Sequence, residues 1–174
     1  MSELKRAGIH LDARDRRIDK LLAEVKRREA EGFAYDAAPA SFELLAKRAL
    51  GEVPDYFEVE SFRVAVERRH NALGEEISVA EAVVKLMVDG ERIMSVGEGN
   101  GPVNALDMAL RKDLGKYQAA IQDLELVDYK VRILNGGTGA TTRVLIESRD
   151  GDGERWFTIG VSPNIVDASF EALI

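Results

Sequence analysis

The residues best suited to catalysis are few and far apart along the chain. The two histidines, His10 and His70, are sixty positions apart. Neither lies in a His-x-His, His-Glu-x-x-His or Gly-x-Ser-x-Gly pattern, so we expect ordinary surface or core residues at both. The chain has no cysteine, which excludes disulfides, cysteine-ligated zinc and thiol nucleophiles. The sequence therefore predicts no catalytic residue and no metal site.

A glycine-rich segment at 97–102, Gly-Glu-Gly-Asn-Gly-Pro, is the best candidate for binding chemistry. We expect it to follow a strand and open a helix, which is the setting of many phosphate-binding turns. Its spacing lacks the Gly-x-Gly-x-x-Gly of dinucleotide-binding turns and Glu98 adds a negative charge, so nucleotide binding is disfavoured. Two interpretations stay open: glycines that only permit a tight turn, or backbone N–H groups that bind the carboxylate of a small ligand.

A second glycine-rich segment at 135–140, Asn-Gly-Gly-Thr-Gly-Ala, is longer than a hairpin requires. It is suited to closing over a ligand and equally to a loose surface hairpin. Tyr129 and Ile133 lie four positions apart, hence on one face of a strand, and Trp156 is the only tryptophan. On residue type alone, these three side chains fit a core better than a pocket.

Two amphipathic helices are expected before any strand, over residues 12–31 and 39–50. Gly32 follows the first helix, Pro39 starts the second and Gly51 ends it. Both carry too little apolar surface to form a core alone. We expect them to pack on another domain or subunit.

The rest of the chain predicts the same order of elements twice. The segment from Gly90 to Leu110 aligns without a gap on the segment from Gly153 to Leu173, with about eight of twenty-one positions identical. The predicted fold is α+β, with two βββα repeats related by a pseudo-twofold axis and preceded by a small helical linker subdomain. The expected division is 1–52 and 53–174. The expected elements are strands near 62–66, 82–88 and 92–96 with a helix over 103–122, then strands near 129–133, 144–146 and 156–161 with a helix from Pro163.

Composition argues against several classes of partner. Lys plus Arg is 24 and Asp plus Glu is 31, a net charge of −7, which does not favour nucleic acid. No apolar stretch approaches the roughly 18 residues of a membrane span, and the N-terminus lacks the features of a signal peptide. We expect a cytoplasmic protein that does not associate with membranes.

The motifs resemble those of one known family. The glycine segment at 97–102, the pair Asp128-Tyr129 and the run Gly-Val-Ser-Pro-Asn-Ile at 160–165 resemble the regulatory (LeuA-type dimerisation) domain of 2-isopropylmalate synthase and citramalate synthase. The resemblance covers Val53 to Ile174, and residues 1–50 resemble the helical communication segment of these enzymes. Residues 40–45 and 56–66 are more similar to citramalate synthases.

The resemblance implies a regulatory role in a longer enzyme. It implies a homodimer that binds leucine or isoleucine near the dimer interface and inhibits, by feedback, a catalytic barrel that condenses acetyl-CoA with a 2-oxo acid. A divalent metal and acetyl-CoA would belong to that barrel, so no cofactor is expected in this chain. The effector residues carried over are Asn100, Val103, Asn104, Leu126, Tyr129, Ile133, Ala140, Thr142, Pro163 and Ile165.

The chemistry of an amino acid fits this set. Two helix starts offer N–H donors for its carboxylate, and Asn100 and Asn104 offer acceptors for its ammonium group. Val103, Leu126, Ile133 and Ile165 would form the apolar wall. Two alternatives stay open: a purely structural dimerisation domain without a ligand site, and a small nucleotide-dependent enzyme that uses the glycine segment.

Overall fold

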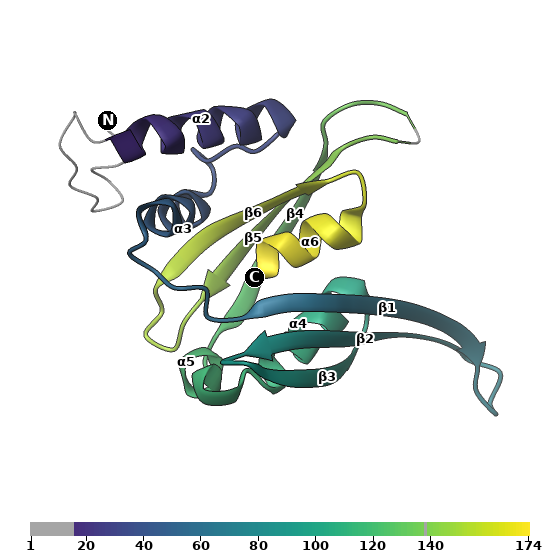
Figure 1. The fold of residues 1–174 in the computed structure, drawn as a ribbon. Helices are drawn as coiled ribbons and strands as arrows, with labels where there is room; N and C mark the ends of the chain where they lie inside the picture. Colours follow the sequence, from purple (N-terminus) through teal and green to yellow (C-terminus); the bar gives the residue numbers. More distant parts are fainter. Residues whose placement is uncertain (1–15, 138) are drawn as a thin grey trace. The chain divides into compact units, whose positions relative to one another are not determined.

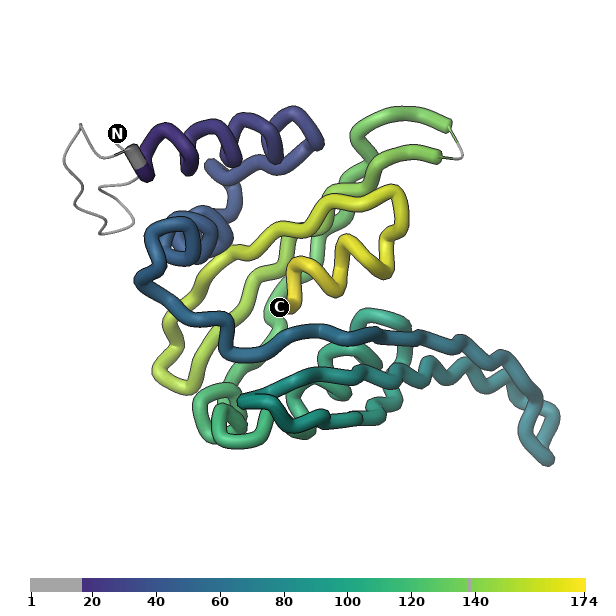
Figure 2. The backbone as a smooth tube through the Cα atoms, in the orientation of Figure 1, coloured from purple at the N-terminus to yellow at the C-terminus, as the bar shows by residue number. Residues whose placement is uncertain are grey.

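The computed structural model describes residues 16–137 and 139–174 (Figures 1 and 2). The chain forms two compact units. One unit is Asp55–Asp123, and the other joins the N-terminal helices, up to Pro54, with Leu124–Ile174. The predicted helix start at Asp12, and His10, lie outside the described residues.

The unit Asp55–Asp123 contains the first βββα repeat. Strands β1 (Glu58–His70), β2 (Glu76–Val88) and β3 (Glu91–Gly99) form an antiparallel sheet in that order. Asp89 and Gly90 both have positive φ, 51° and 82°, as a two-residue hairpin turn between β2 and β3 requires. Helix α4 (Pro102–Lys112) follows and covers one face of the sheet with Ala105, Leu106, Ala109 and Leu110.

The helix predicted over 103–122 is shorter than expected. It ends at Lys112, because Asp113 is extended and Gly115 takes a φ of +57°. The Asp113 carboxylate accepts the Gly115 N–H at 2.9 Å, which stabilises the turn. A 3₁₀ turn, η1 (Gly115–Tyr117), and the short helix α5 (Gln118–Ile121) complete the segment.

The other unit contains the second repeat. Strands β4 (Glu125–Ile133), β5 (Thr142–Arg149) and β6 (Arg155–Ser162) form an antiparallel sheet in that order, and helix α6 (Ile165–Leu173) packs on one face. The first strand of each sheet has a register shift, between Val59 and Ser61 in β1 and between Leu126 and Asp128 in β4. In both strands the shift lies near the N-terminal end, and the pairing after it is uninterrupted. The predicted α+β fold with two βββα repeats is confirmed.

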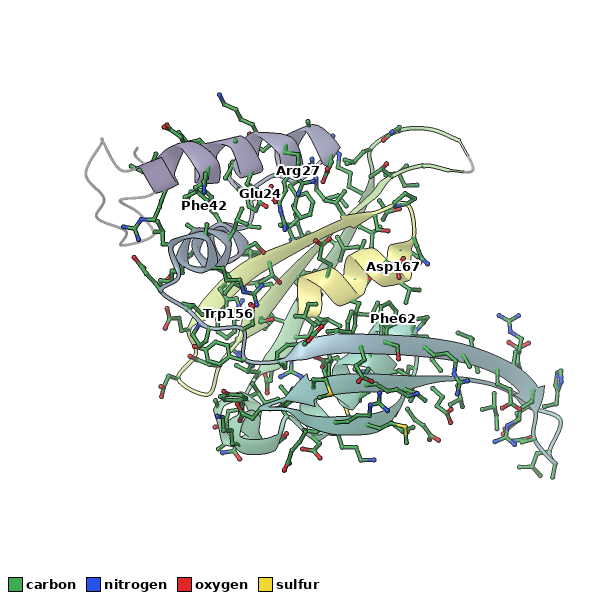
Figure 3. All side chains as sticks on the ribbon, viewed as in Figure 1. Glu24, Arg27, Phe42, Phe62, Trp156 and Asp167 are labelled. Atoms are coloured by element: carbon green, nitrogen blue, oxygen red, sulfur yellow. The ribbon has the colours of Figure 1, made fainter. Side chains whose placement is uncertain are left out.

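The N-terminal helices cover the opposite face of the second sheet. Helix α2 (Arg16–Glu31) and helix α3 (Pro39–Leu50, as predicted) enclose a core with Ile159 and Leu145 of the sheet. Phe42 of α3 belongs to this core (Figure 3). Ser41 Oγ accepts the Ile159 N–H of edge strand β6 at 3.0 Å. The sheet of the second repeat is therefore the middle layer between α6 and the α2–α3 pair.

Glycines set the distance between sheet and helix in both repeats. Gly97 and Gly99 lie inside β3, whereas the sequence predicted that they end the strand. A Cβ on Gly97 would lie 2.4 Å from the Ala109 backbone nitrogen, so α4 rests directly on the strand. At the aligned position, a Cβ on Gly160 would lie 1.9 Å from the Ala168 carbonyl oxygen. These contacts set how closely each helix approaches its sheet.

Candidate functional site

The first group of candidate residues lies where β3 meets α4. Asn100 and Asn104 are exposed and Val103 is half-buried. Gly101 is the N-cap residue of α4 and supplies no side-chain cap, while Pro102 occupies the first turn. The N–H groups of this turn therefore keep the ability to bind an anion.

The side chain of Asn104 is partly committed to the turn itself. Its Oδ1 accepts the Asn100 N–H at 3.2 Å, and a Cβ on Gly99 would lie 2.3 Å from the same oxygen. The same Cβ would lie 2.8 Å from the Ala105 backbone nitrogen, and it is this backbone contact that requires glycine at 99. The hydrogen bond to Asn104 removes the Asn100 N–H from the donors available to a ligand.

The second group begins on β4, where Leu126 and Tyr129 face α6. Both pack, partly buried, against the core cluster that includes Val144, Ile146 and Ala168. The Tyr129 hydroxyl lies 2.8 Å from Ser169 Oγ. These two candidates therefore contribute to the core, as residue type alone suggests for Tyr129.

Two further candidates form a cross-strand pair at the end of the second sheet, here called a rung. Ile133 and Thr142 are cross-strand partners, and Thr142 is also paired with Ser162 of β6. Thr142 is buried, whereas Ile133 is 66% exposed. Ala140, half-buried, precedes this rung in the glycine-rich loop.

The last two candidates, Pro163 and Ile165, are exposed in the turn between β6 and α6. The helix predicted from Pro163 begins at Ile165, because Asn164 is the N-cap residue: its side chain accepts the Val166 N–H at 2.9 Å. Asn164 is not among the residues that the sequence identified. Its signal was present, because Asn followed by Asp167 three positions later is the order of a helix N-terminus, and Figure 3 shows Asp167 on α6.

The candidates thus form two sets. Asn100, Val103 and Asn104 share one turn of the unit Asp55–Asp123, and the other seven belong to the second unit. Within the second unit, a hollow of about 550 Å³ lies beside the rung, lined by Gly32, Leu134, Thr141 and Pro163 among others. Pro163 and the C-terminal end of α2 therefore line the same hollow.

Asp128, next to Tyr129 in the sequence motif, belongs to a different environment. Its carboxylate lies 2.7 Å from Lys130 Nζ and accepts the Tyr129 N–H. The hydrogen bond from Lys130, followed by the one from the Tyr129 N–H, lowers the pKa of Asp128. Lys130 pairs across the sheet with Leu145, on the face that α2 and α3 cover, so Asp128 is separated from the Tyr129 side chain.

Within residues 16–137 and 139–174, no His, Asp or Glu side chains gather in threes that could hold a metal ion. None of the helices in the same part of the chain is long and apolar enough to cross a membrane.

Comparison with known proteins gives a consistent result. Residues 36–174 match the model of the LeuA allosteric (dimerisation) domain. The chain is 44% identical to (R)-citramalate synthase of Aquifex aeolicus (strain VF5), over 98% of this chain and 32% of that enzyme. It is 49% identical to (R)-citramalate synthase of Streptomyces coelicolor, over 97% and 31%. It is 33% identical to 2-isopropylmalate synthase of Pseudoalteromonas atlantica, over 84% and 28%. The chain spans about a third of the length of these relatives.

Proposed function

Since this chain belongs to the LeuA allosteric (dimerisation) domain family, we propose that it is an effector-binding regulatory domain. It binds a branched-chain amino acid, leucine or isoleucine, and so mediates feedback inhibition of an acetyl-CoA-dependent 2-oxo-acid synthase of the citramalate synthase kind. The condensation, with its divalent metal and acetyl-CoA, would take place on the catalytic barrel of such an enzyme.

One observation carries the proposal: the two repeats differ at the N-cap residue of their helices. Asn164 caps α6 with its side chain, whereas Gly101 at the aligned position gives α4 no side-chain cap. A helix start without a cap has N–H donors that suit a carboxylate, and the helix dipole adds to the attraction. We assign the effector carboxylate to the start of α4.

The remaining candidates supply what the rest of an amino acid needs. Asn100 offers a side-chain carbonyl to the ammonium group, since a buried charge without partners is costly. Val103 offers apolar surface beside the start of α4, and on the second unit Ile133 and Ile165 are 66% and 46% exposed. Leucine and isoleucine are isomers, so the choice between them rests on the shape of the apolar surface that contacts the effector side chain.

The partner proposed for the domain is a second copy of itself, besides the catalytic barrel. Val131 and Ile133 are two positions apart on β4, hence on one face of the strand, and are 41% and 66% exposed. An exposed apolar face of this kind is what a second copy would cover in an isologous dimer.

The alternative is a purely structural dimerisation domain. The packing of Leu126 and Tyr129 in the core and the internal contact of Asn104 favour it, because these residues have structural roles without any ligand. Isothermal titration calorimetry with leucine, isoleucine and valine separates the two. Saturable binding of a branched-chain amino acid supports the regulatory domain, and heats no larger than dilution for all three support the structural one.

A further inference from the structure

The C-terminal end of α2 rests on the end of strand β4. Gly32, directly after the helix, has a φ of +116°. A Cβ at this position would lie 2.3 Å from Leu134 Cδ1 and 3.4 Å from Val161 Cγ1. The positive φ is what favours glycine here, since the neighbouring atoms are the ends of flexible side chains. Leu134 directly follows Ile133, one of the proposed effector contacts.

Arg143, on the neighbouring strand β5, also contacts Gly32. Its Nε donates a hydrogen bond to the Gly32 carbonyl oxygen. A cation on the last carbonyl groups of a helix also opposes the negative end of the helix dipole. Arg143 directly follows Thr142 on β5, and successive side chains of a strand point to opposite faces, so Thr142 faces α6 while Arg143 faces α2.

The two strands are joined at this level by one backbone hydrogen bond. The Leu134 N–H donates to the Thr141 carbonyl at 2.9 Å, next to the rung in which Ile133 and Thr142 are partners. We call Gly32, Leu134 and Arg143 the Gly32 clamp. It connects α2 to the rung that carries two proposed effector residues.

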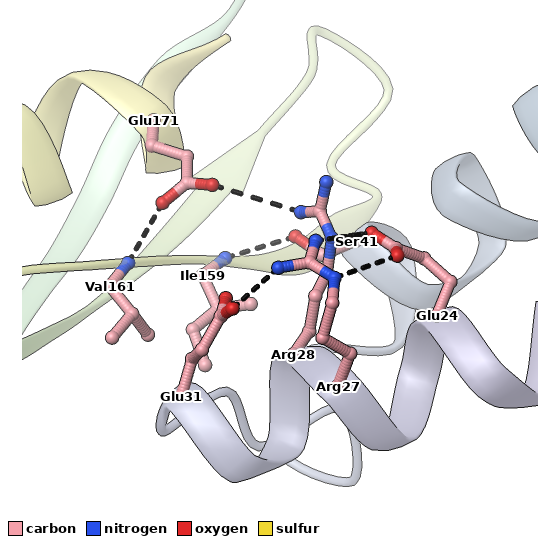
Figure 4. Close-up of polar contacts among 8 residues, drawn as sticks. All are labelled: Glu24, Arg27, Arg28, Glu31, Ser41, Ile159, Val161 and Glu171. Carbon is pink, nitrogen blue, oxygen red and sulfur yellow. Dashed lines mark hydrogen bonds and ion pairs between the residues drawn. The ribbon is translucent and has the colours of Figure 1, made fainter.

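A second contact ties α2 to helix α6. Glu171 of α6 accepts the Val161 N–H at 2.9 Å and lies 3.8 Å from the Arg28 guanidinium of α2 (Figure 4). Val161 is also the residue whose side chain lies beside Gly32. Helix α2 thus contacts the sheet through the Gly32 clamp and contacts α6 through Glu171. Both contacts lie near the C-terminal end of strand β6.

We infer that Arg143 is a positioning residue for the effector site: through the Gly32 clamp, the end of α2 holds the Ile133–Thr142 rung in the geometry that binds the effector. The inference rests on the proposed function. Binding free energies are reciprocal, so an effector that requires this geometry stabilises the end of α2 by the same factor by which an anchored α2 raises effector affinity.

The test combines two measurements on Arg143→Met, which removes the donor and keeps the aliphatic stem. Amide hydrogen exchange is measured without ligand at two positions. The Leu134 N–H donates to the Thr141 carbonyl beside the rung, and the Phe33 N–H donates to the Arg28 carbonyl at the end of α2. We expect both to exchange about two- to tenfold faster, the range that the loss of one hydrogen bond gives. Ala168 in α6, bonded to the Asn164 carbonyl, should not change. Effector affinity by calorimetry should fall by a similar factor.

Two further variants control the result. Arg143→Lys keeps a donor and should restore most of the protection at Leu134. Arg155→Met removes a comparable guanidinium from the same sheet, where Arg155 contacts Glu147, and should change neither exchange at Leu134 nor affinity. Faster exchange at Phe33 without any change at Leu134 overturns the inference, as does an unchanged affinity in Arg143→Met. If no amino acid binds the wild-type chain, the proposed function fails, and the exchange at Leu134 still decides whether Arg143 controls the rung.

Discussion

The Tyr129 hydroxyl donates its proton to Ser169 Oγ across 2.8 Å. The direction follows from Ser169, whose single hydroxyl proton is given to the Ile165 carbonyl at 2.6 Å. Ser169 is completely buried, so its oxygen has no access to water. The pair therefore ties strand β4 to the first turn of α6, and Tyr129 supports the position of Ile165 whether or not it contacts a ligand.

Tyr129→Phe is expected to lower the free energy of unfolding by about 0.5–1.5 kcal/mol, because a buried acceptor loses its donor. Urea unfolding measures this change. Tyr56→Phe removes a hydroxyl from an exposed ring and should be neutral. If Tyr129→Phe is as stable as Tyr56→Phe, the hydrogen bond does not contribute to stability.

Gly160→Ala tests the close approach of α6 to its sheet. The new Cβ would lie 1.9 Å from the Ala168 carbonyl oxygen, so the helix must move, at a cost of about 3 kcal/mol. Gly136→Ala is the matched control, since nothing lies within 4 Å of its Cβ and its φ is not positive. Equal melting temperatures for the two variants would contradict this packing of helix on sheet.

Much of this architecture follows from sequence patterns. The strand patterns and the repeat that aligns Gly90 with Gly153 predicted the fold class, and Pro39 and Gly51 bounded the helix over 39–50. The glycines of β3 misled the prediction, because their role is contact with α4, and the residues that make this contact cannot be identified from spacing alone.

The candidate site could be predicted only in part. The turn before α4 and the turn before α6 were located from their glycine, proline and asparagine residues. The burial of Thr142 and the contact between Arg143 and Gly32 depend on residues up to 111 positions apart in the sequence. No local pattern encodes such pairs, because the sheet brings them together.

The helix starts provide a test of the carboxylate assignment. Gly101 has an extended backbone, with a φ of −167°, that asparagine also adopts, and nothing lies within 4 Å of its Cβ. Gly101→Asn should add a few tenths of a kcal/mol to stability through a new N-cap, and should weaken effector binding because the side chain competes for the same N–H groups. Calorimetry measures the binding change, and unaltered affinity would place the carboxylate elsewhere.

Asn164→Ala is the companion variant at α6. It should cost about 1 kcal/mol by removing the existing cap. Its effect on effector affinity should be smaller than that of Gly101→Asn, because this helix start already has a side-chain acceptor. The opposite ranking of the two affinities would move the carboxylate to α6.

The pH dependence of stability should report on Glu171. Burial raises the pKa of this carboxyl, against the opposing effects of the Val161 N–H and Arg28. The folded state therefore holds the proton more tightly than the unfolded state, and this contribution to stability is lost as the pH rises from about 4.3 through the raised pKa. Glu171→Gln keeps an acceptor for Val161 and removes the titration.

Urea unfolding from about pH 3.5 to pH 7 checks this, since the range spans the ordinary carboxyl pKa. The stability of Glu171→Gln relative to wild type should increase with pH across the range. A difference that decreases with pH would mean that attraction to Arg28 outweighs burial.

Thermal unfolding of the purified chain with candidate effectors tests the central claim most directly. A ligand that binds only the folded state adds about 2.7 kcal/mol when present at a hundredfold excess over its Kd. Leucine or isoleucine should then raise the melting temperature by about 5–10 °C, given the usual scaling for a domain of this size. Lysine and glutamate should not, because their charged ends would be buried against the apolar wall. A folded chain whose melting temperature is unchanged by both leucine and isoleucine would contradict the assignment of an effector site.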